Sequence, residues 1–284
     1  MAVAFMANTQ HLYVRTDVLK ANGIAIPKTY EEVVAASEKI RAAGKMKYPY
    51  AAAYKAGWNL AEEFVNMYIG HGGEFFEAGS AKPSINNAKG VATLNMLKKL
   101  ADLSNPDYLT HDSEAIKVEW EAGNVAIMTL WASRSGTLLD DEGDAKITAA
   151  TKLVAPATVG GGNIPAATLW WDGFTLAKNR PDADAEASFR AMAHAASSKE
   201  MVAKAADQAV WLVEGFVPGP KSVGVIEAVK MGAKPYPMLP QMGLMHGALG
   251  SEIVEFLQGN ESAEQALKDV EAAYNSKAKE QGFL

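Results

Sequence analysis

The sequence has no cysteine among its 284 residues, which excludes disulfide bonds and thiolate chemistry. It has no apolar run approaching the roughly 20 residues that a membrane-spanning helix needs. Lysines and arginines form no cluster and the net charge is −6, so the composition predicts no nucleic-acid partner. The first ten residues lack the basic and long apolar stretches of an export signal, so none is recognisable in this chain.

Motifs for catalysis and metal binding are also missing. The five histidines, which never fall four residues apart, are His11, His71, His111, His194 and His246. No zinc-protease or serine-nucleophile pattern occurs, and the glycine run at 160–162 lacks the Lys-Ser/Thr of a phosphate-binding loop. The acidic stretch 140–144 is typical of a solvated turn. We therefore predict no metal, no cofactor and no enzyme activity. A hydrolase with two remote carboxylates stays open as an alternative.

What the sequence does contain is ordinary globular composition, with 49% hydrophobic and 21% charged residues. Its length favours two lobes of about 100–200 residues each. Short apolar runs of strand length alternate with amphipathic stretches, which predicts an α/β fold rather than a bundle or a sandwich. The expected strands span residues 5–14, 48–54, 125–130, part of 146–156, and 168–178.

Capping signals place several helices. Thr29 followed by Glu32 predicts a capping box at the start of a helix that ends at Gly44. Thr16 and Ser113 are expected to cap two further helices. Other helices are predicted to begin near residue 57 and residue 87, and the last hundred residues to be mostly helical. Their expected ranges are 183–197, 198–206, 223–231, 241–257 and 262–277.

Tryptophans stand at loop edges beside polar residues. An indole offers a flat apolar face to the C–H side of a sugar, and neighbouring amides, carboxylates or arginine can serve the hydroxyl groups. Trp120 fits a helical core position instead, and one of Trp170 and Trp171 must point inward on a strand. The candidates for ligand contact are Trp58, Trp131, Trp171 and Trp211.

Several segments, in order, resemble family 1 extracellular solute-binding proteins of ABC importers, especially the maltose or sugar type. They are HLYVRTDVLKANGIAIPKTYEEVVAASEKI, GHGGEFF, VEWEAGNVAIMTLWAS, LWWDGFTLAKNRPDADAEASFRAMAHAASSKEM and YPMLPQM. The resemblance runs from about Phe5 to the C-terminus. It implies a periplasmic-binding-protein-like (type II) fold, in which two α/β lobes joined by crossover strands close on a ligand.

The same resemblance implies a division of the chain. Residues 12–168 and 224–284 are expected to form a complete C-terminal lobe. Residues 1–11 and 169–223 would form the crossover and a remnant of the N-terminal lobe. Family members carry roughly 100 further residues before the opening segment, about one small α/β domain. We therefore expect that the N-terminal lobe is largely missing here, and that this chain alone binds ligand weakly or not at all.

Three positions depart from the family pattern. Ala4 replaces a proline usual in the crossover, and Val14 replaces a tyrosine. His246 stands where maltose-type proteins tend to carry a stacking aromatic residue, which makes a maltodextrin site doubtful. Mapped by motif, the candidate ligand-binding residues are Asn8, Gln10, Trp58, Trp131, Arg134, Trp171, Asp172, Trp211 and His246.

The resemblance implies a non-enzymatic function. The protein would capture a sugar or polyol by aromatic stacking and hydrogen bonding and deliver it to the permease subunits of an ABC importer. Its location would be periplasmic, or extracellular with a lipid anchor. The alternative is an assembly or structural fragment without independent ligand binding, whose partner would be a second copy or a complementing N-terminal lobe.

Overall fold

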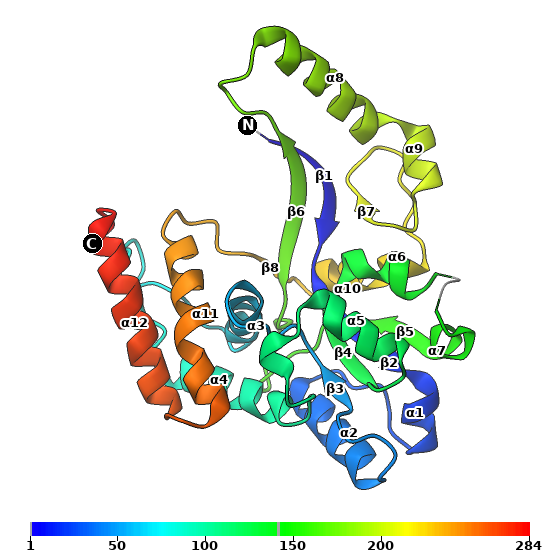
Figure 1. Ribbon diagram of the computed structural model, residues 1–284, viewed down its shortest axis with the longest axis vertical. Coiled ribbons are helices and arrows are strands. Elements are labelled where there is room, and N and C mark those ends of the chain that lie inside the picture. Colours follow the sequence, from blue (N-terminus) through cyan, green and yellow to red (C-terminus); the bar gives the residue numbers. More distant parts are fainter. Residues whose placement is uncertain (1, 141–142) are drawn as a thin grey trace.

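The structure is a computed structural model that describes residues 2–140 and 143–284, so two residues of the acidic turn 140–144 lie outside it. It contains two four-stranded sheets with helices packed around one of them (Figure 1). The predicted α/β fold class is confirmed. The first sheet has the order β3-β4-β2-β5 and the second the order β7-β1-β6-β8.

The first sheet is buried and mixed. Strand β2 is antiparallel to both of its neighbours, whereas β3 runs parallel to β4. Every residue of β2 is buried, including the polar Gln10, His11 and Arg15. The strands of this sheet are β2 (Gln10–Arg15), β3 (Tyr50–Ala51), β4 (Ile127–Trp131) and β5 (Thr151–Val154).

The second sheet is built around a long antiparallel pair that extends away from the body of the molecule (Figure 1). Only its base is widened, by two short strands. Its strands are β1 (Ala2–Asn8), β6 (Thr168–Thr175), β7 (Val210–Trp211) and β8 (Lys234–Pro235). The outer residues of β1 are exposed, so this sheet contributes little to the core.

One extended segment joins the two sheets. The sequence predicted a single strand over residues 5–14, and the structure divides it at Thr9 into β1 and β2. Thr9 is fully buried, and its hydroxyl donates a hydrogen bond of 2.8 Å to the carbonyl oxygen of Thr168. Because Thr168 is the first residue of β6, this hydrogen bond links the β1–β2 connection to the start of β6.

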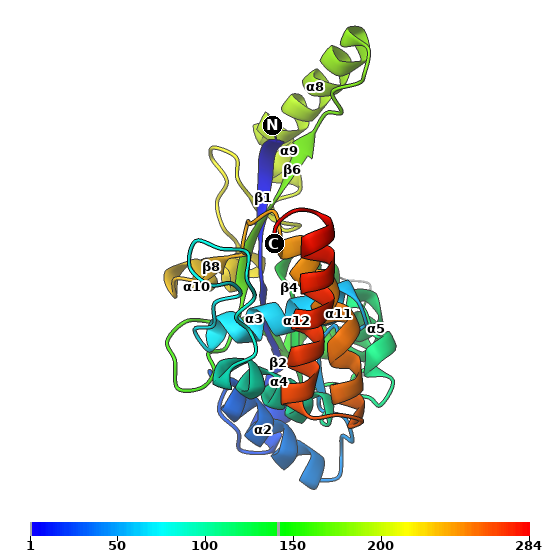
Figure 2. The ribbon, with the colours of Figure 1, turned by 90° about the vertical axis from the view of Figure 1, so that its left-hand side faces the viewer.

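Four helices form the main helical layer, as Figures 1 and 2 show from two sides. Helices α11 and α12 pack against each other and against α3 and α4. Phe64, Leu60 and Leu97 are among the fully buried side chains in this layer, and burying each such side chain stabilises the fold by about 1.5–3 kcal/mol. The four helices are α3 (Trp58–Gly70), α4 (Ala88–Ala101), α11 (Met242–Gln258) and α12 (Ala263–Glu280).

The remaining helices surround the first sheet or lie at the far end of the second. Helix α8 stands apart at the top of Figure 1, and it has no buried residue. No helix in the described ranges combines the length and apolarity needed to cross a membrane. These elements are α1 (Thr16–Ala21), α2 (Tyr30–Ala42), η1 (Tyr108–Thr110), α5 (Ser113–Glu121), η2 (Ala132–Arg134), α6 (Ser135–Leu138), α7 (Ala145–Ala150), α8 (Asp182–Ser197), α9 (Lys199–Lys204), η3 (Pro220–Ser222) and α10 (Val223–Lys230).

The capping predictions had mixed outcomes. Thr29 and Glu32 form the predicted capping box. The predictions for Thr16 and Ser113 were wrong. Thr16 is the first helical residue, and its hydroxyl donates to the carbonyl oxygen of Ala150. Asp112 caps α5 in place of Ser113, because its carboxylate lies one residue earlier and accepts two backbone N–H groups.

The proposed lobe boundaries run close to the division between the sheets. The first sheet is drawn from residues 10–154, and β1, β6 and β7 supply most of the second. Strand β8 joins the second sheet although it lies within the range 224–284. The division at 12–168 plus 224–284 therefore stays a proposal.

Candidate functional site

A cluster of aromatic rings lies where α3, β4, β6 and α11 meet. Trp58 begins α3, and its ring centroid lies 6.2 Å from that of Trp131 and 5.9 Å from that of Trp170. Trp131 and Trp170 meet edge to face at 6.1 Å. Trp58 keeps half of its surface exposed, at 50%. We call these three rings, together with Tyr236, the aromatic site.

Tyr236 and His246 complete and support the cluster. The ring of Tyr236 lies 4.4 Å from that of Trp170. The hydroxyl of Tyr236 is 2.9 Å from Nδ1 of His246, and Nε2 of His246 is 3.0 Å from the carbonyl oxygen of Trp58. His246 is buried, and burial lowers the pKa of its imidazole. In this arrangement His246 connects two members of the aromatic site.

Strand β6 explains why Trp170 enters the site and Trp171 does not. Successive strand residues point to opposite faces of the sheet, so the side chains of Trp170 and Trp171 lie on opposite faces. Trp170 packs among the other rings, whereas Trp171 is 46% exposed and pairs with Ala7 on β1. Trp171, a predicted ligand-binding residue, therefore lies outside the aromatic site, and its contact with a ligand stays a prediction. Trp170 was not among the predicted residues, although alternation along this strand required one of the two to face inward.

Two carboxyl groups lie directly behind the aromatic site. Glu62 and Glu63 on α3 are buried, and burial raises the pKa of each to about 8. Oε1 of Glu62 accepts a hydrogen bond of 3.1 Å from the indole Nε1 of Trp170. These residues were not among the predicted site residues, because only the fold brings the inward face of α3 against β6.

Asn8 and Gln10 are occupied by internal contacts. Oδ1 of Asn8 accepts from the backbone N–H of Ser133, and Nδ2 donates to the Ser133 hydroxyl at 3.2 Å. Gln10 is buried and donates from Nε2 to Oε1 of Glu63 at 3.0 Å. Both side chains brace the crossover in this structure, and their contact with a ligand stays a prediction.

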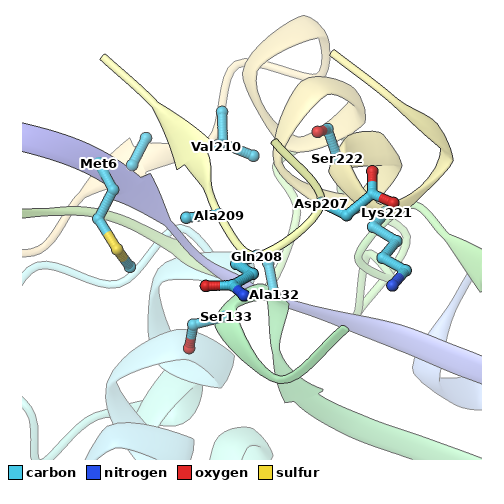
Figure 3. Close-up of a pocket in the computed structure, with 10 residues that line it drawn as sticks. Met6, Ala132, Ser133, Asp207, Gln208, Ala209, Val210, Lys221 and Ser222 are labelled. Atoms are coloured by element: carbon cyan, nitrogen blue, oxygen red, sulfur yellow. The ribbon is translucent and has the colours of Figure 1, made fainter. Parts of the chain in front are cut away.

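A narrow pocket lies between Met6 of β1 and Ser133 of η2 (Figure 3). Figure 3 shows Gln208 next to Ala132 and Ser133, with Asp207 and, from η3, Lys221 nearby. The volume of about 10 Å³ is near the minimum for one water molecule and far below that of a ligand site. The pocket is therefore a junction between the second sheet and η2.

Arg134 and Asp172 lie near the site without joining the ring cluster. The Arg134 guanidinium forms an ion pair with Glu114 on α5. Asp172 is an exposed residue of β6 paired with Met6, and partial burial raises the pKa of its carboxyl. Their ligand roles stay predictions.

Trp211 belongs to a different surface. Its indole donates a hydrogen bond of 2.8 Å to the carbonyl oxygen of Ala205, and its ring lies 6.3 Å from that of Phe5. With Phe174 these rings line an apolar pocket of about 190 Å³ between the second sheet and helices α8 and α9. The structure therefore groups Trp58, Trp131 and His246 and separates them from Trp211.

The described residues bring together no group of three or more histidine, aspartate or glutamate side chains suited to a metal ion. The chemistry available at the aromatic site is consequently that of ring faces, carboxyl groups and amides. Such a surface can stack on an apolar face of a ligand and exchange hydrogen bonds with its hydroxyl groups.

Comparison with protein families gives a match to bacterial extracellular solute-binding proteins over residues 2–203. A sequence relative from Sinorhizobium fredii, described as "Probable amino-acid ABC transporter periplasmic-binding protein", is 30% identical over 128 residues. That alignment covers 44% of this chain and 29% of the relative. The chain therefore aligns with less than a third of the length of this curated relative.

Solved structures share the fold. The maltose-bound MalE3 protein of T. maritima superposes with a TM-score of 0.83 at 20% identity, covering 96% of this chain and 72% of that one. A solute-binding protein of Agrobacterium radiobacter in complex with ribitol gives 0.81 at 20%, covering 97% and 71%. One of Agrobacterium vitis with bound D-mannitol gives 0.80 at 17%, covering 99% and 73%.

Proposed function

The chain belongs to the family of bacterial extracellular solute-binding proteins, and from that membership we propose that it binds a sugar or polyol at the aromatic site for an ABC importer. The family function is binding rather than catalysis. The observation that supports the proposal most is Trp58, which is half exposed while its neighbours Trp131 and Trp170 hold it in place.

Ring geometry favours a ligand with apolar C–H faces. Ring faces stack on such surfaces, and the ionisable groups close by are the carboxyls of Glu62 and Asp172, whose pKa values burial raises. Arg134, the cationic candidate, is already paired with Glu114. An uncharged polyhydroxy compound therefore suits this surface better than an anion. Maltose, ribitol and D-mannitol, bound in structures of the same fold, are the first compounds to test.

Two-dimensional NMR of the indole N–H groups tests the proposal, since each of the six tryptophans gives one signal and weak binding is visible. Adding maltose, ribitol or D-mannitol at millimolar concentration should shift the signals of Trp58, Trp131 and Trp170 and leave those of Trp120 and Trp211 unchanged. Single Trp-to-Phe variants assign the signals. The proposal fails if these sugars shift none of the three signals and a panel of amino acids does.

Delivery to a permease and an extracellular location form part of the same proposal. Their support is the family match and the transporter name of the curated relative. A permease complex reconstituted in vesicles would show uptake of the bound sugar only when this protein is present. Uptake that is equal with and without the protein would contradict the delivery role.

A second candidate function, an assembly module, is favoured by one observation. The pocket formed by Phe5, Phe174 and Trp211 is almost entirely apolar and open to solvent, and exposed apolar surfaces of this kind mark interaction sites. The proposed partner is a second copy of this chain. Analytical ultracentrifugation should then show a dimer that Phe174→Glu converts to a monomer, and a monomeric wild-type protein at high concentration would rule this candidate out.

A further inference from the structure

A chain of buried polar side chains crosses from the aromatic site to the first sheet. It joins three elements: Glu62, Glu63 and Asn66 from α3, Gln10 from β2, and Thr168 from β6. Nδ2 of Asn66 donates to Oε1 of Gln10 at 3.2 Å, and Nε2 of Gln10 donates to Oε1 of Glu63 at 3.0 Å. All five residues are at least nine-tenths buried.

Thr168 lies at the junction of these hydrogen bonds, between Glu62 and Asn66. Its hydroxyl oxygen lies 2.8 Å from Oε1 of Glu62 and 2.7 Å from Oδ1 of Asn66. Both of those atoms are acceptors when Glu62 is ionised, but a hydroxyl has only one proton to donate. The indole N–H of Trp170 also reaches Oε1 of Glu62, but Oε2 of Glu62 is buried with no hydrogen-bond partner among the described residues. An ionised Glu62 would therefore place charge on a buried oxygen that has no donor, which is unfavourable.

A protonated Glu62 carries no charge on this unpartnered oxygen. Its O–H donates to the Thr168 hydroxyl, which in turn donates to Asn66. Asn66 then donates to Gln10, and Gln10 donates to Glu63. The indole Nε1 of Trp170 lies 2.8 Å from the Thr168 oxygen and 3.1 Å from Oε1 of Glu62, so it donates into the same junction.

The surrounding charges favour the neutral acid as well. The titratable groups that face Glu63 are the phenols of Tyr30, Tyr50 and Tyr54, and Tyr236 faces Glu62. Glu63 also faces Glu62. Burial holds these phenols neutral by raising their pKa values. In the described part of the chain no lysine or arginine forms an ion pair with either carboxyl.

His246 is the remaining titratable group nearby. It is bonded to Tyr236 and to the backbone of Trp58 rather than to either carboxyl, and burial lowers the pKa of its ring. It therefore supplies no positive charge to this chain of groups at neutral pH.

We propose that Glu62 is a positioning residue for the ligand site and acts as a neutral carboxylic acid. Through Thr168 and the indole N–H it fixes the ring of Trp170, against which Trp58, Trp131 and Tyr236 pack. The proposal rests on the proposed function of the aromatic site. When Glu62 loses its proton, the Thr168 hydroxyl turns toward the carboxylate, Asn66 loses its donor, and the anchor of Trp170 changes.

The indole N–H signals provide the test. From about pH 6 to about pH 10, the wild-type Trp170 signal should move with a midpoint near the alkaline pKa expected for a buried carboxyl. Glu62→Gln keeps the shape of the neutral acid and both a donor and an acceptor, so its Trp170 signal should stay at the acidic position throughout. A matched control, Glu227→Gln on α10, removes a partly exposed carboxylate that pairs with Lys230 and should keep the wild-type transition.

Two results would overturn the proposal: a wild-type Trp170 signal that does not move over this range, or a transition that persists in Glu62→Gln. If Glu62→Gln does not fold, infrared spectra of the wild-type protein decide instead. The carbonyl stretch of protonated carboxylic acids should be present at neutral pH and disappear at alkaline pH, and its absence at neutral pH contradicts a neutral Glu62.

Ligand titrations separate this inference from the proposed function. Polyol affinity should fall at alkaline pH in the wild type and stay constant in Glu62→Gln. If the Trp170 transition behaves as expected and no sugar or polyol binds at any pH, the proposed function fails and the positioning of Trp170 by Glu62 stands. If polyols bind with the same affinity at both pH values, Glu62 does not position the site.

Discussion

Trp58 and Trp120 are the same kind of side chain in opposite surroundings. Trp58 is half exposed at the aromatic site. Trp120 is fully buried, its indole donating to the Thr151 hydroxyl at 3.1 Å and its ring meeting Tyr13 edge to face. Burial therefore leaves Trp58 available for the proposed ligand contact and places Trp120 in the core, a distinction that their sequence neighbourhoods suggested.

Replacing each tryptophan by alanine should separate these roles. Trp120→Ala should lower the free energy of unfolding by about 3–5 kcal/mol, because it leaves a cavity in the core. Trp58→Ala should change it by about 1 kcal/mol or less and weaken sugar or polyol binding about tenfold or more. Urea denaturation and ligand titration measure the two quantities. Unchanged affinity in Trp58→Ala would contradict its role.

Two buried carboxyls give the stability a definite pH dependence. The pKa of Glu62 and of Glu63 is raised from 4.5 to about 8 in the folded protein. The folded state therefore binds more protons than the unfolded state between these values, and stability falls as pH rises through this window. His11 acts at lower pH: burial lowers its pKa from 6.5 to about 4, so its contribution is lost as pH falls through that range.

Above about pH 7.5 the carboxyls dominate this slope, because His11, His71 and His246, whose pKa values burial lowers, are then largely neutral in both states. Chemical denaturation of the wild type should give a smaller free energy of unfolding at about pH 8.5 than at about pH 7.5. The decrease should be smaller in Glu62→Gln and unchanged in the surface control Glu227→Gln. A wild-type stability that rises over this interval would show that the two carboxyls are ionised in the folded state.

At the scale of elements, α11 contacts the start of α3 through a close approach of the two backbones. The N–H of Gly57, which precedes α3, donates to the carbonyl oxygen of Gly250 at 3.0 Å. A Cβ on Gly250 would overlap the backbone of Gly57, whereas a Cβ on Gly247, in the same helix, would meet nothing within 4 Å. The close approach of these two helices therefore requires glycine at position 250 but not at position 247.

This pair supplies a matched experiment. Gly250→Ala should lower the free energy of unfolding by about 1–3 kcal/mol, because the backbones must separate, and should shift the indole signal of Trp58. Gly247→Ala should be neutral or stabilising by up to about 1 kcal/mol, since alanine favours the helix. Thermal or urea denaturation checks both. Equal effects of the two substitutions would show that the contact at Gly57 is not restrictive.

Element boundaries show where sequence patterns stop being sufficient. The helix beginning at Thr29 was predicted correctly because a capping box satisfies its own N–H groups with neighbouring residues. The strand expected over 48–54 shrinks to Tyr50–Ala51, since its length is set by pairing with β4 rather than by its own residues. Strands β7 and β8, each two residues long, had no signal in the sequence.

At the scale of the whole molecule, the apolar core is concentrated on one side. The main core cluster is drawn from the first sheet and the helices around it. Helix α8, by contrast, buries none of its residues. Segments with few buried contacts open locally at a small free-energy cost, so stability should be unevenly distributed along the chain.

Hydrogen exchange should reveal this asymmetry. Amide hydrogens of α8 should exchange faster than those of α3 and α11 by orders of magnitude, because local opening of α8 exposes no core. Mass spectrometry of deuterated peptides from the three helices makes the comparison in one sample. Equal protection of α8 and α11 would indicate that α8 is covered in solution, as the proposed association through the Phe174 surface would require.

The sequence by itself determined the α/β class, the family and most helices, because these depend on local periodicity, capping and ordered motifs. It also marked Trp58 and Trp131 as candidates for ligand contact, a role that stays a prediction. Only the tertiary structure decided that Trp170 rather than Trp171 joins them, and that Glu62 stands behind it. Those contacts link residues about a hundred positions apart, and their partners are chosen by how α3 packs against β6, which no local pattern records.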